Sequence, residues 1–178
     1  MPSTAWPADI QRTLRVNQSG EFGAIGIYQA QRWLARLTWP QGIALIDEML
    51  AHEREHLAIF STLLQRRGIR SCYALRLWRV GGWLLGTVTG LFGRNGILAC
   101  TQSVETTVLQ HLAEQRERIG ARDAELIAAI DAIEAQEREH RDHGAAMARA
   151  PSLPLPLRLI RRLAAQATEA AIRLSMRF

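Results

Sequence analysis

The sequence is short of several residue types, and some of these shortages exclude a class of protein. It has no lysine, since all 22 basic residues are arginine, and aromatic residues make up only 6% of it. Its two cysteines, Cys72 and Cys100, form no closely spaced pair, so neither a disulfide framework nor a Cys-x-x-Cys metal module is expected. Both cysteines fit a reducing compartment. No apolar run approaches the roughly 20 residues that a membrane-spanning helix requires.

Other missing patterns narrow the fold. No stretch of alternating β-branched residues suggests a sheet, whereas the helix-favouring residues Ala, Leu, Arg, Glu and Gln are abundant. No G-x-G-x-x-G follows a strand, so the chain is not expected to carry its own dinucleotide domain. The first residues lack a basic stretch followed by an apolar run, so no secretory signal is expected. With 178 residues, the chain is expected to fold as one all-α domain, 1–178.

The hydrophobic pattern predicts four long helices and one further helix. The first two long helices cover about 8–37 and 43–67, and the third runs through 98–112. The fourth covers about 123–147, with Met147 as its last apolar position, and the further helix is a basic C-terminal one at about 155–178. Gly68 should close the second helix. Residues 151–178 contain five arginines and one acid. This charge fits either a solvated face or a surface for anionic phosphate groups.

The tetrapeptide Glu-Arg-Glu-His occurs twice, at 53–56 and at 137–140, and a glutamate precedes each copy by 32 residues. Residues three apart share one face of a helix, so each Glu-x-x-His directs a carboxylate and an imidazole the same way. Four carboxylates and two imidazoles are the ligand set of a di-iron or di-manganese centre in a four-helix bundle. The six candidate ligands are Glu21, Glu53, His56, Glu105, Glu137 and His140.

These candidate ligands occupy positions that an apolar core stripe should fill. Between Ile46 and Leu63, for example, Glu53 and His56 continue a row of apolar residues at steps of three and four. Four carboxylates facing one another in a core would repel, and a pair of divalent cations removes that cost. The register therefore favours metal ligands. The other polar residues of the motifs are expected to form a solvated face: His52, Arg54, Glu55, Glu139, Arg141 and His143.

A segment at about 73–93 separates the second and third bundle helices, and its 14 residues 80–93 carry no charge. The segment fits a buried crossover of the bundle, or a stretch lying in a membrane interface with Arg76 and Arg79 outside it. We favour the interface, because the arginines flank the run on one side. The residues expected to contact lipid are Trp78, Trp83, Leu84, Leu85, Leu91 and Phe92.

Longer stretches of the chain resemble the demethoxyubiquinone hydroxylase family. They are 15–24 (RVNQSGEFGA), 50–57 (LAHEREHL), 77–82 (LWRVGG), 99–101 with 104–105, and 170–172 (AAI), so the resemblance covers nearly the whole chain. It implies a ferritin-like four-helix bundle with a long apolar crossover between helices two and three and an extra C-terminal helix. It also implies two irons: Glu53 and Glu137 bridge them, Glu21 and His56 complete one, and Glu105 and His140 complete the other.

The resemblance further implies hydroxylation of the ring of demethoxyubiquinol in ubiquinone biosynthesis, with O₂ and with NADH as electron donor. The polyprenyl tail of that quinol resides in a membrane, so the segment 80–93 is expected to form its entrance. The protein is then expected to lie peripherally on the cytoplasmic face of a bacterial inner membrane. Contacts with other ubiquinone-biosynthesis proteins fit this setting, and no nucleic acid partner is expected. The oligomeric state stays open.

The chain departs from the family pattern at positions that are not candidate ligands: Gln18, Thr106, Leu112 and Arg173. No catalytic residue is expected beyond the metal ligands. Candidates for holding a ligand in place or for an electron route are His111, Asp142 and Arg12. His111 and Asp142 also fit a simple polar surface. Two alternatives share the ligands: a ferritin-like iron oxidation or storage protein, which needs no lipid contact, and a di-iron hydroxylase of another substrate such as tRNA, which the arginine content would suit.

Overall fold

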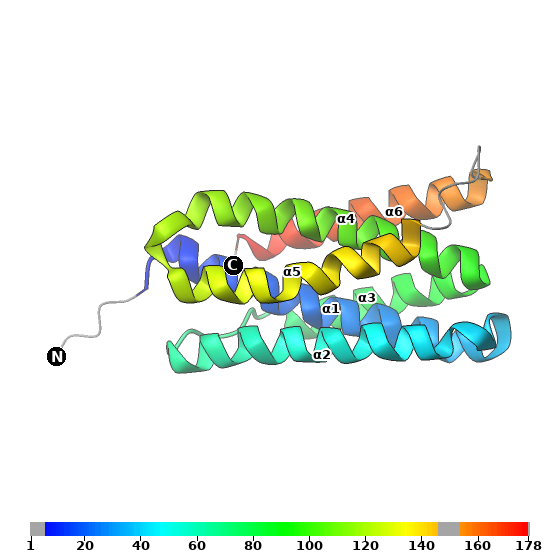
Figure 1. Cartoon of the computed structure of the whole chain (residues 1–178), viewed down its shortest axis with the longest axis horizontal. Coiled ribbons are helices and arrows are strands. Elements are labelled where there is room, and N and C mark those ends of the chain that lie inside the picture. The colour runs from blue at the N-terminus through cyan, green and yellow to red at the C-terminus, as the bar shows by residue number, and fades with distance from the viewer. Residues whose placement is uncertain (1–5, 146–153, 178) are drawn as a thin grey trace.

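The computed structural model describes residues 6–145 and 154–177, and these residues are largely helical (Figure 1). The elements are α1 (Ala8–Thr38), η1 (Pro40–Gly42), α2 (Ile43–Arg66), α3 (Leu75–Gly90), α4 (Gly93–Ile119), η2 (Gly120–Arg122), α5 (Ala124–Ala145) and α6 (Leu155–Ser175). No strand occurs within the described ranges, so the all-α expectation is confirmed. Met147 and Phe178, expected in the last two helices, lie outside the described residues.

The bundle consists of α1, α2, α4 and α5, in which α1 packs on α2 and α4, and α5 packs on α4 and α2. The expected crossover between α2 and α4 is itself a helix, α3, which lies against α1, and the basic C-terminal helix α6 lies mainly against α4 (Figure 1). The ferritin-like architecture expected from the sequence is therefore confirmed. Among the described helices, none combines the length and apolarity needed to cross a bilayer.

Glycines, rather than large side chains, form the contact between α3 and α1. A Cβ added at Gly82 would lie 2.1 Å from the carbonyl oxygen of Gly23, and one at Gly86 would lie 2.3 Å from that of Ile27. Small residues spaced four apart let two helix backbones touch. Because glycines occupy the buried face of α3, most of its large apolar side chains are left on the outer faces. The segment is thus a packed crossover on one side and an exposed apolar surface on the other.

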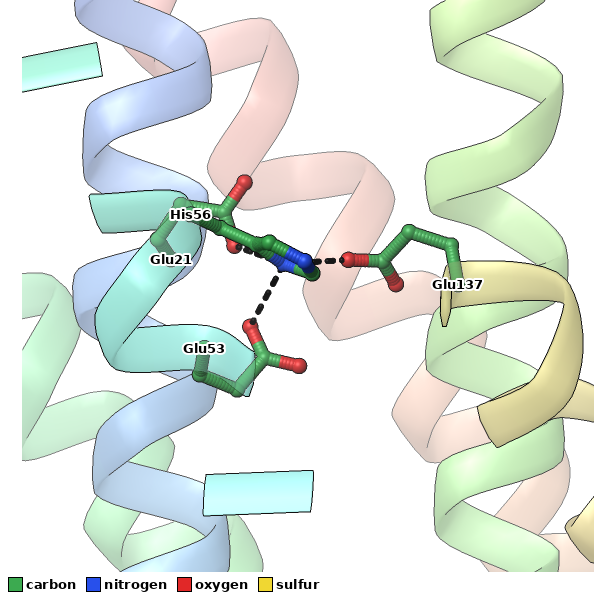
Figure 2. Close-up of side chains that lie close together, drawn as sticks. All are labelled: Glu21, Glu53, His56 and Glu137. Carbon is green, nitrogen blue, oxygen red and sulfur yellow. Dashed lines mark ion pairs between the residues drawn. The ribbon is translucent and has the colours of Figure 1, made fainter. Parts of the chain in front are cut away.

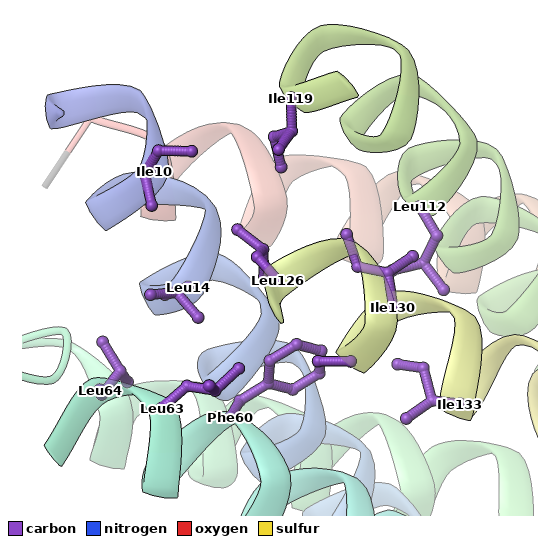
Figure 3. Packing of buried hydrophobic residues seen from close by; sticks show 11 residues of the cluster. Ile10, Leu14, Phe60, Leu63, Leu64, Leu112, Ile119, Leu126, Ile130 and Ile133 are labelled. Atoms are coloured by element: carbon purple, nitrogen blue, oxygen red, sulfur yellow. The ribbon is translucent and has the colours of Figure 1, made fainter. Parts of the chain in front are cut away.

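Two clusters of buried apolar side chains lie on either side of the candidate ligands. Along α2, for example, Glu53 and His56 fall between Leu50 of one cluster and Phe60 of the other. Full burial of each large apolar side chain stabilises the fold by about 1.5–3 kcal/mol. The first cluster (Figure 3) contains Ile10, Leu14, Phe60, Leu63, Leu64, Leu112, Ile119, Leu126, Ala129, Ile130 and Ile133. The second contains Ala24, Ile25, Tyr28, Ala35, Ile46, Met49, Leu50 and Ile97.

The start of α5 is joined to the end of α2 by a buried ion pair. Gly68, with a φ of 64°, follows the end of α2 as expected. The preceding Arg67 donates to Asp123 at 2.6 and 2.9 Å, and Asp123 also accepts the backbone N–H of Leu126 at 3.0 Å. Asp123 therefore caps α5 and neutralises a buried guanidinium at the same time.

Candidate metal centre

The four bundle helices all contribute to one buried polar layer between the two apolar clusters. Each of its charged members points inward, and none has more than 6% of its surface exposed. The i, i+3 spacing within α2 and within α5 brings a carboxylate and an imidazole to the same face of each helix. The members are Glu21 from α1, Glu53 and His56 from α2, Glu105 from α4, and Glu137 and His140 from α5.

Within this layer the six side chains form two overlapping groups. In each group, one potential ligand atom per residue lies within 4.8 Å of the others. Figure 2 shows the ring of His56 among three carboxylates: its Nδ1 lies 2.9 Å from Glu137, 3.7 Å from Glu21 and 4.0 Å from Glu53. The first group is Glu21, Glu53, His56 and Glu137, and the second is Glu53, Glu105, Glu137 and His140, so Glu53 and Glu137 belong to both.

Several of the atoms that would bind a metal have no other partner. Nδ1 of His56, Nδ1 of His140, one oxygen of Glu53 and both oxygens of Glu137 are buried without a hydrogen bond. The short contact between His56 and Glu137 is therefore a close approach that lacks hydrogen-bond geometry. Orphaned polar atoms in a core cost free energy, and a bound cation would satisfy them. Carboxylate oxygens with imidazole nitrogens are a donor set that suits iron or manganese.

The electrostatics of the layer also favour the binding of a positive charge. Burial, followed by the repulsion of neighbouring carboxylates, raises the pKa of Glu53 and of Glu105 well above the ordinary value. Burial opposes a charge on His56 too, yet the carboxylates of Glu137 and Glu21 outweigh it and raise its pKa to about 10. For His140 burial prevails and lowers the pKa to about 4. Without a cation the layer therefore holds protons that a metal would displace.

Sequence reasoning missed three residues that contact the candidate ligands. The hydroxyl of Tyr28 donates to Oε1 of Glu105 at 2.7 Å. Nδ1 of His52 lies 3.0 Å from Nε2 of His140, and Oε1 of Gln136 lies 2.7 Å from Nε2 of His56. The placement of His52 on a solvated face was wrong, because its ring stacks on that of His140. The only sequence signal for His52 and Gln136 is that each directly precedes a copy of Glu-Arg-Glu-His.

A cavity of about 290 Å³ adjoins the polar layer on the side of α1 and α4. Four carboxylates line one part of it, those of Glu21, Glu53, Glu105 and Glu137, whereas the two candidate ligand histidines do not. Most of the remaining lining is apolar or small and comes from α1, α3, α4 and α6, including Ile27, Leu85, Val108 and Ala171. The arrangement gives an apolar molecule access to the carboxylates.

The family model of the ubiquinone biosynthesis protein COQ7 matches residues 8–175. The chain belongs to this family. It is similar to the 3-demethoxyubiquinol 3-hydroxylase of Rhodospirillum rubrum, with 38% identity over 159 residues, which cover 87% of this chain and 74% of the relative. It is also similar to the mitochondrial NADPH-dependent 3-demethoxyubiquinone 3-hydroxylase of Rattus norvegicus, with 33% identity over 175 residues, or 96% and 79% of the two chains. The resemblance found in the sequence, and with it the expectation of a hydroxylase enzyme, is confirmed.

The structure places each of the four residues that were expected to depart from the family pattern. Gln18 is buried and donates to Ser61 at 3.0 Å, and Leu112 is buried in the first apolar cluster beside the cavity. Thr106 bonds to a backbone carbonyl of its own helix, and the exposed Arg173 pairs with Glu169. Each of the four residues thus has local contacts, and none of them is a candidate ligand.

The three candidates for holding a ligand in place or for an electron route lie in different surroundings. His111 lines the cavity with its Nε2 buried and unpartnered, so its role stays a prediction. Asp142 does not hold a ligand within the described structure; its carboxylate pairs with Arg141 at 2.7 Å and its side chain is 64% exposed. Residues two apart on a helix face different ways, so Asp142 cannot share the face of His140. Arg12 is exposed on the first turns of α1.

The expected lipid-contacting residues divide between the surface and the cavity. Large parts of four of them are exposed: Trp83, Leu84, Leu91 and Phe92. Trp78 and Leu85 instead line the cavity. Contact with lipid stays a prediction for all six residues.

Proposed function

We propose that this chain hydroxylates the ring of demethoxyubiquinol in ubiquinone biosynthesis, with O₂ and an external reductant. The observation that carries the proposal is the cavity, which extends from four carboxylates of the polar layer to α3 and α6. Carboxylates with two imidazoles suit a pair of iron ions, and an apolar cavity suits a quinol ring. The names of the relatives indicate a demethoxyubiquinol or demethoxyubiquinone as substrate.

The six side chains of the polar layer would hold the two irons. Because Glu53 and Glu137 belong to both ligand groups, we assign them the bridging positions, with Glu21 and His56 on one iron and Glu105 and His140 on the other. Iron bound there would supply electrons and Lewis acidity for O₂ activation. In the balanced reaction, one oxygen atom enters a ring C–H bond and the other leaves as water, with two electrons and two protons consumed. Tyr28 keeps Glu105 in place by its hydrogen bond.

The size of the cavity fits the ring of the quinol and excludes the whole molecule. About 290 Å³ lies at the lower end of the range for small-molecule sites, which is roughly 300–1,000 Å³. A polyprenyl tail must therefore leave the cavity. The lining residues of α3 and α6, such as Trp78, Leu85 and Ala171, mark the side on which the tail would leave. An iron store needs no such apolar space.

The exit of the tail supports a peripheral location on a membrane, and we propose the cytoplasmic face of a bacterial inner membrane. Beside the cavity, α3 exposes Val80, Leu84 and Val88, and α6 exposes Leu159 and Leu163. Such faces insert shallowly into the headgroup region of a bilayer, and exposed arginines of α6 can pair with anionic lipid. We propose a reduced nicotinamide as the electron donor. The family resemblance implies NADH, and the rat relative is named NADPH-dependent.

An isotope experiment tests the proposal. Iron-loaded protein is incubated with a short-tailed demethoxyubiquinol, ¹⁸O₂ and either NADH or NADPH, and the quinol product is analysed by mass spectrometry. One ¹⁸O atom should enter the ring. Glu105→Ala should abolish the labelling, because one ligand group loses a member. Glu117→Ala, which changes an exposed glutamate of the same helix, should leave it unchanged.

Three results would contradict the proposal. Oxygen consumption that scales with added Fe(II), forms a ferric mineral and ignores quinol would identify an iron store. Label in tRNA but not in quinol would identify a hydroxylase of nucleic acid. Labelled quinol in equal amounts from wild type and Glu105→Ala would place the chemistry outside the polar layer.

A further inference from the structure

The outward sides of the two candidate ligand histidines are held in the same way. Nε2 of His140 lies 3.0 Å from Nδ1 of His52, and Nε2 of His56 lies 2.7 Å from Oε1 of Gln136. His52 and Gln136 each directly precede one copy of Glu-Arg-Glu-His. The residue before each copy therefore contacts the histidine of the other copy. This crossed arrangement joins α2 to α5 behind the polar layer.

The opposite nitrogens of both rings face the carboxylates. Nδ1 of His140 lies 3.4 Å from Glu53, and Nδ1 of His56 lies 2.9 Å from Glu137. An imidazole binds a metal through Nδ1 only when the proton is on Nε2, and a hydrogen-bond acceptor beside Nε2 favours that tautomer. The amide oxygen of Gln136 can only accept. Nδ1 of His52 accepts when the proton of that ring is on its Nε2.

We propose that His52 and Gln136 are positioning residues, which fix crosswise the metal-binding tautomer and the ring orientation of His140 and His56. The inference rests on the metal centre of the proposed function and is independent of the substrate. It assigns a role to each residue that precedes a motif copy. It also makes the two metal positions unequal, because an imidazole stands behind one ligand ring and an amide behind the other.

The surroundings of His52 separate this role from substrate binding. Neither His52 nor Gln136 lines the cavity, which lies on the other side of the polar layer. The ring of His52 is stacked on that of His140, with centroids 5.2 Å apart and planes inclined by 13°. His52 thus makes two separable contacts with His140, a stacked face and a hydrogen bond. Phenylalanine can replace the first contact only, and glutamine can replace the second only.

This difference allows an experiment that separates a role of the hydrogen bond from a role of the stacked ring, because the two roles predict opposite results for the two variants. The wild type, His52→Phe and His52→Gln are loaded anaerobically with ⁵⁷Fe(II), and iron affinity and Mössbauer spectra are measured. His52→Phe should weaken one of two iron positions about 10–100-fold, the usual effect of losing a partner behind a ligand. His52→Gln, which copies Gln136, should stay within a few-fold of wild type. Gln136→Met should weaken the other position, and Glu55→Gln, an exposed change in the same turn of α2, should change neither.

The tautomer itself gives a readout without iron. In metal-free protein labelled with ¹⁵N, the imidazole shifts of His140 should change in His52→Phe and be preserved in His52→Gln. Normal iron binding in His52→Phe together with weakened binding in His52→Gln would show that stacking alone matters and would overturn the inference. Wild-type affinity in all variants would overturn it as well. Failure of the wild type to bind iron would remove the metal centre, whereas iron binding without quinol hydroxylation would overturn only the proposed function.

Discussion

The hydrogen bond from Tyr28 to Glu105 is one contact of the polar layer whose contribution to stability a single substitution can measure. Burial, together with the negative charge of Glu105, raises the pKa of Tyr28 well above its usual value, so its hydroxyl remains a donor. We expect Tyr28→Phe to lower the free energy of unfolding of the metal-free protein by about 1–3 kcal/mol, because a buried carboxyl oxygen loses its partner. Urea denaturation would measure the loss. Tyr73→Phe, at a site that is 85% exposed, should change it by no more than about 0.5 kcal/mol. Equal effects of the two changes would contradict the assigned contact.

The sequence predicts single residues well where local periodicity decides their place. The candidate ligands could be identified because an apolar stripe with a carboxylate and an imidazole in register has few explanations. The contact of His52 with His140 could not, since it joins residues 88 apart and depends on how α2 meets α5. For Asp142 the sequence left open a role in holding a ligand and a place on the polar surface. The structure shows the second, because its side chain is 64% exposed and its carboxylate pairs with Arg141.

At the scale of elements, the junction of α2 and α5 depends on a charge that acid removes. Burial alone would raise the pKa of Asp123, but the hydrogen bonds from Arg67 and from the N–H of Leu126 outweigh it and lower the pKa below the usual 3.8. The pairing contributes its full stabilisation at pH values above the usual pKa of 3.8, and this stabilisation is lost as the pH falls through the lowered pKa of Asp123. At pH 7, Asp123→Asn should cost about 1–3 kcal/mol, because the buried guanidinium of Arg67 loses a charged partner while the cap is kept.

Urea denaturation at pH 7 and near pH 3 would measure this dependence. The difference between Asp123→Asn and wild type should shrink at the lower pH, where Asp123 of the wild type begins to take up its proton. Glu125→Gln changes the exposed partner of the same arginine, 2.8 Å away, and should cost much less than Asp123→Asn at pH 7, because solvent screens an exposed pair. A deficit of Asp123→Asn that stays constant with pH would rule out the ion pair as its source.

For the helix α3, the sequence could predict some features of its packing and not others. Its apolar, uncharged run fitted both a buried crossover and an interfacial segment, and the structure contains features of each. Four-residue spacing of Gly82, Gly86 and Gly90 could have indicated the buried face, because only small residues permit such close helix contact. The identity of the opposing helix could not be read from the run itself, since the partner glycine Gly23 lies far away in the chain.

For the whole molecule, the exposed apolar faces of α3 and α6 predict reversible membrane binding. Leu84 and Leu91 are 60% and 64% exposed, so replacing both with Asp should preserve the fold and detach the protein from vesicles. Sedimentation with vesicles containing anionic lipid would measure binding, and circular dichroism would verify the fold. Replacing Ala51 and Ala58, exposed on α2, with Asp adds the same charge elsewhere and should leave binding unchanged.

Salt provides a second measure of the same surface. Exposed charges are screened beyond about 8 Å at physiological ionic strength, so binding should weaken with salt if the arginines of α6 face anionic lipid. Equal binding by the α3 variant and the α2 control would show that α3 does not face the membrane.

The polar layer lies between two apolar clusters, and the first of these already joins all four bundle helices. A chain built in this way can reach its fold while the layer still holds protons in place of metal. With iron as the proposed metal, we therefore expect the newly synthesised chain to fold first as an inactive bundle and to bind iron afterwards. The rate of quinol hydroxylation would then depend on the concentration of ferrous iron available in the cell. An iron-starved cell would retain folded, metal-free protein that regains activity when iron is added, without new protein synthesis.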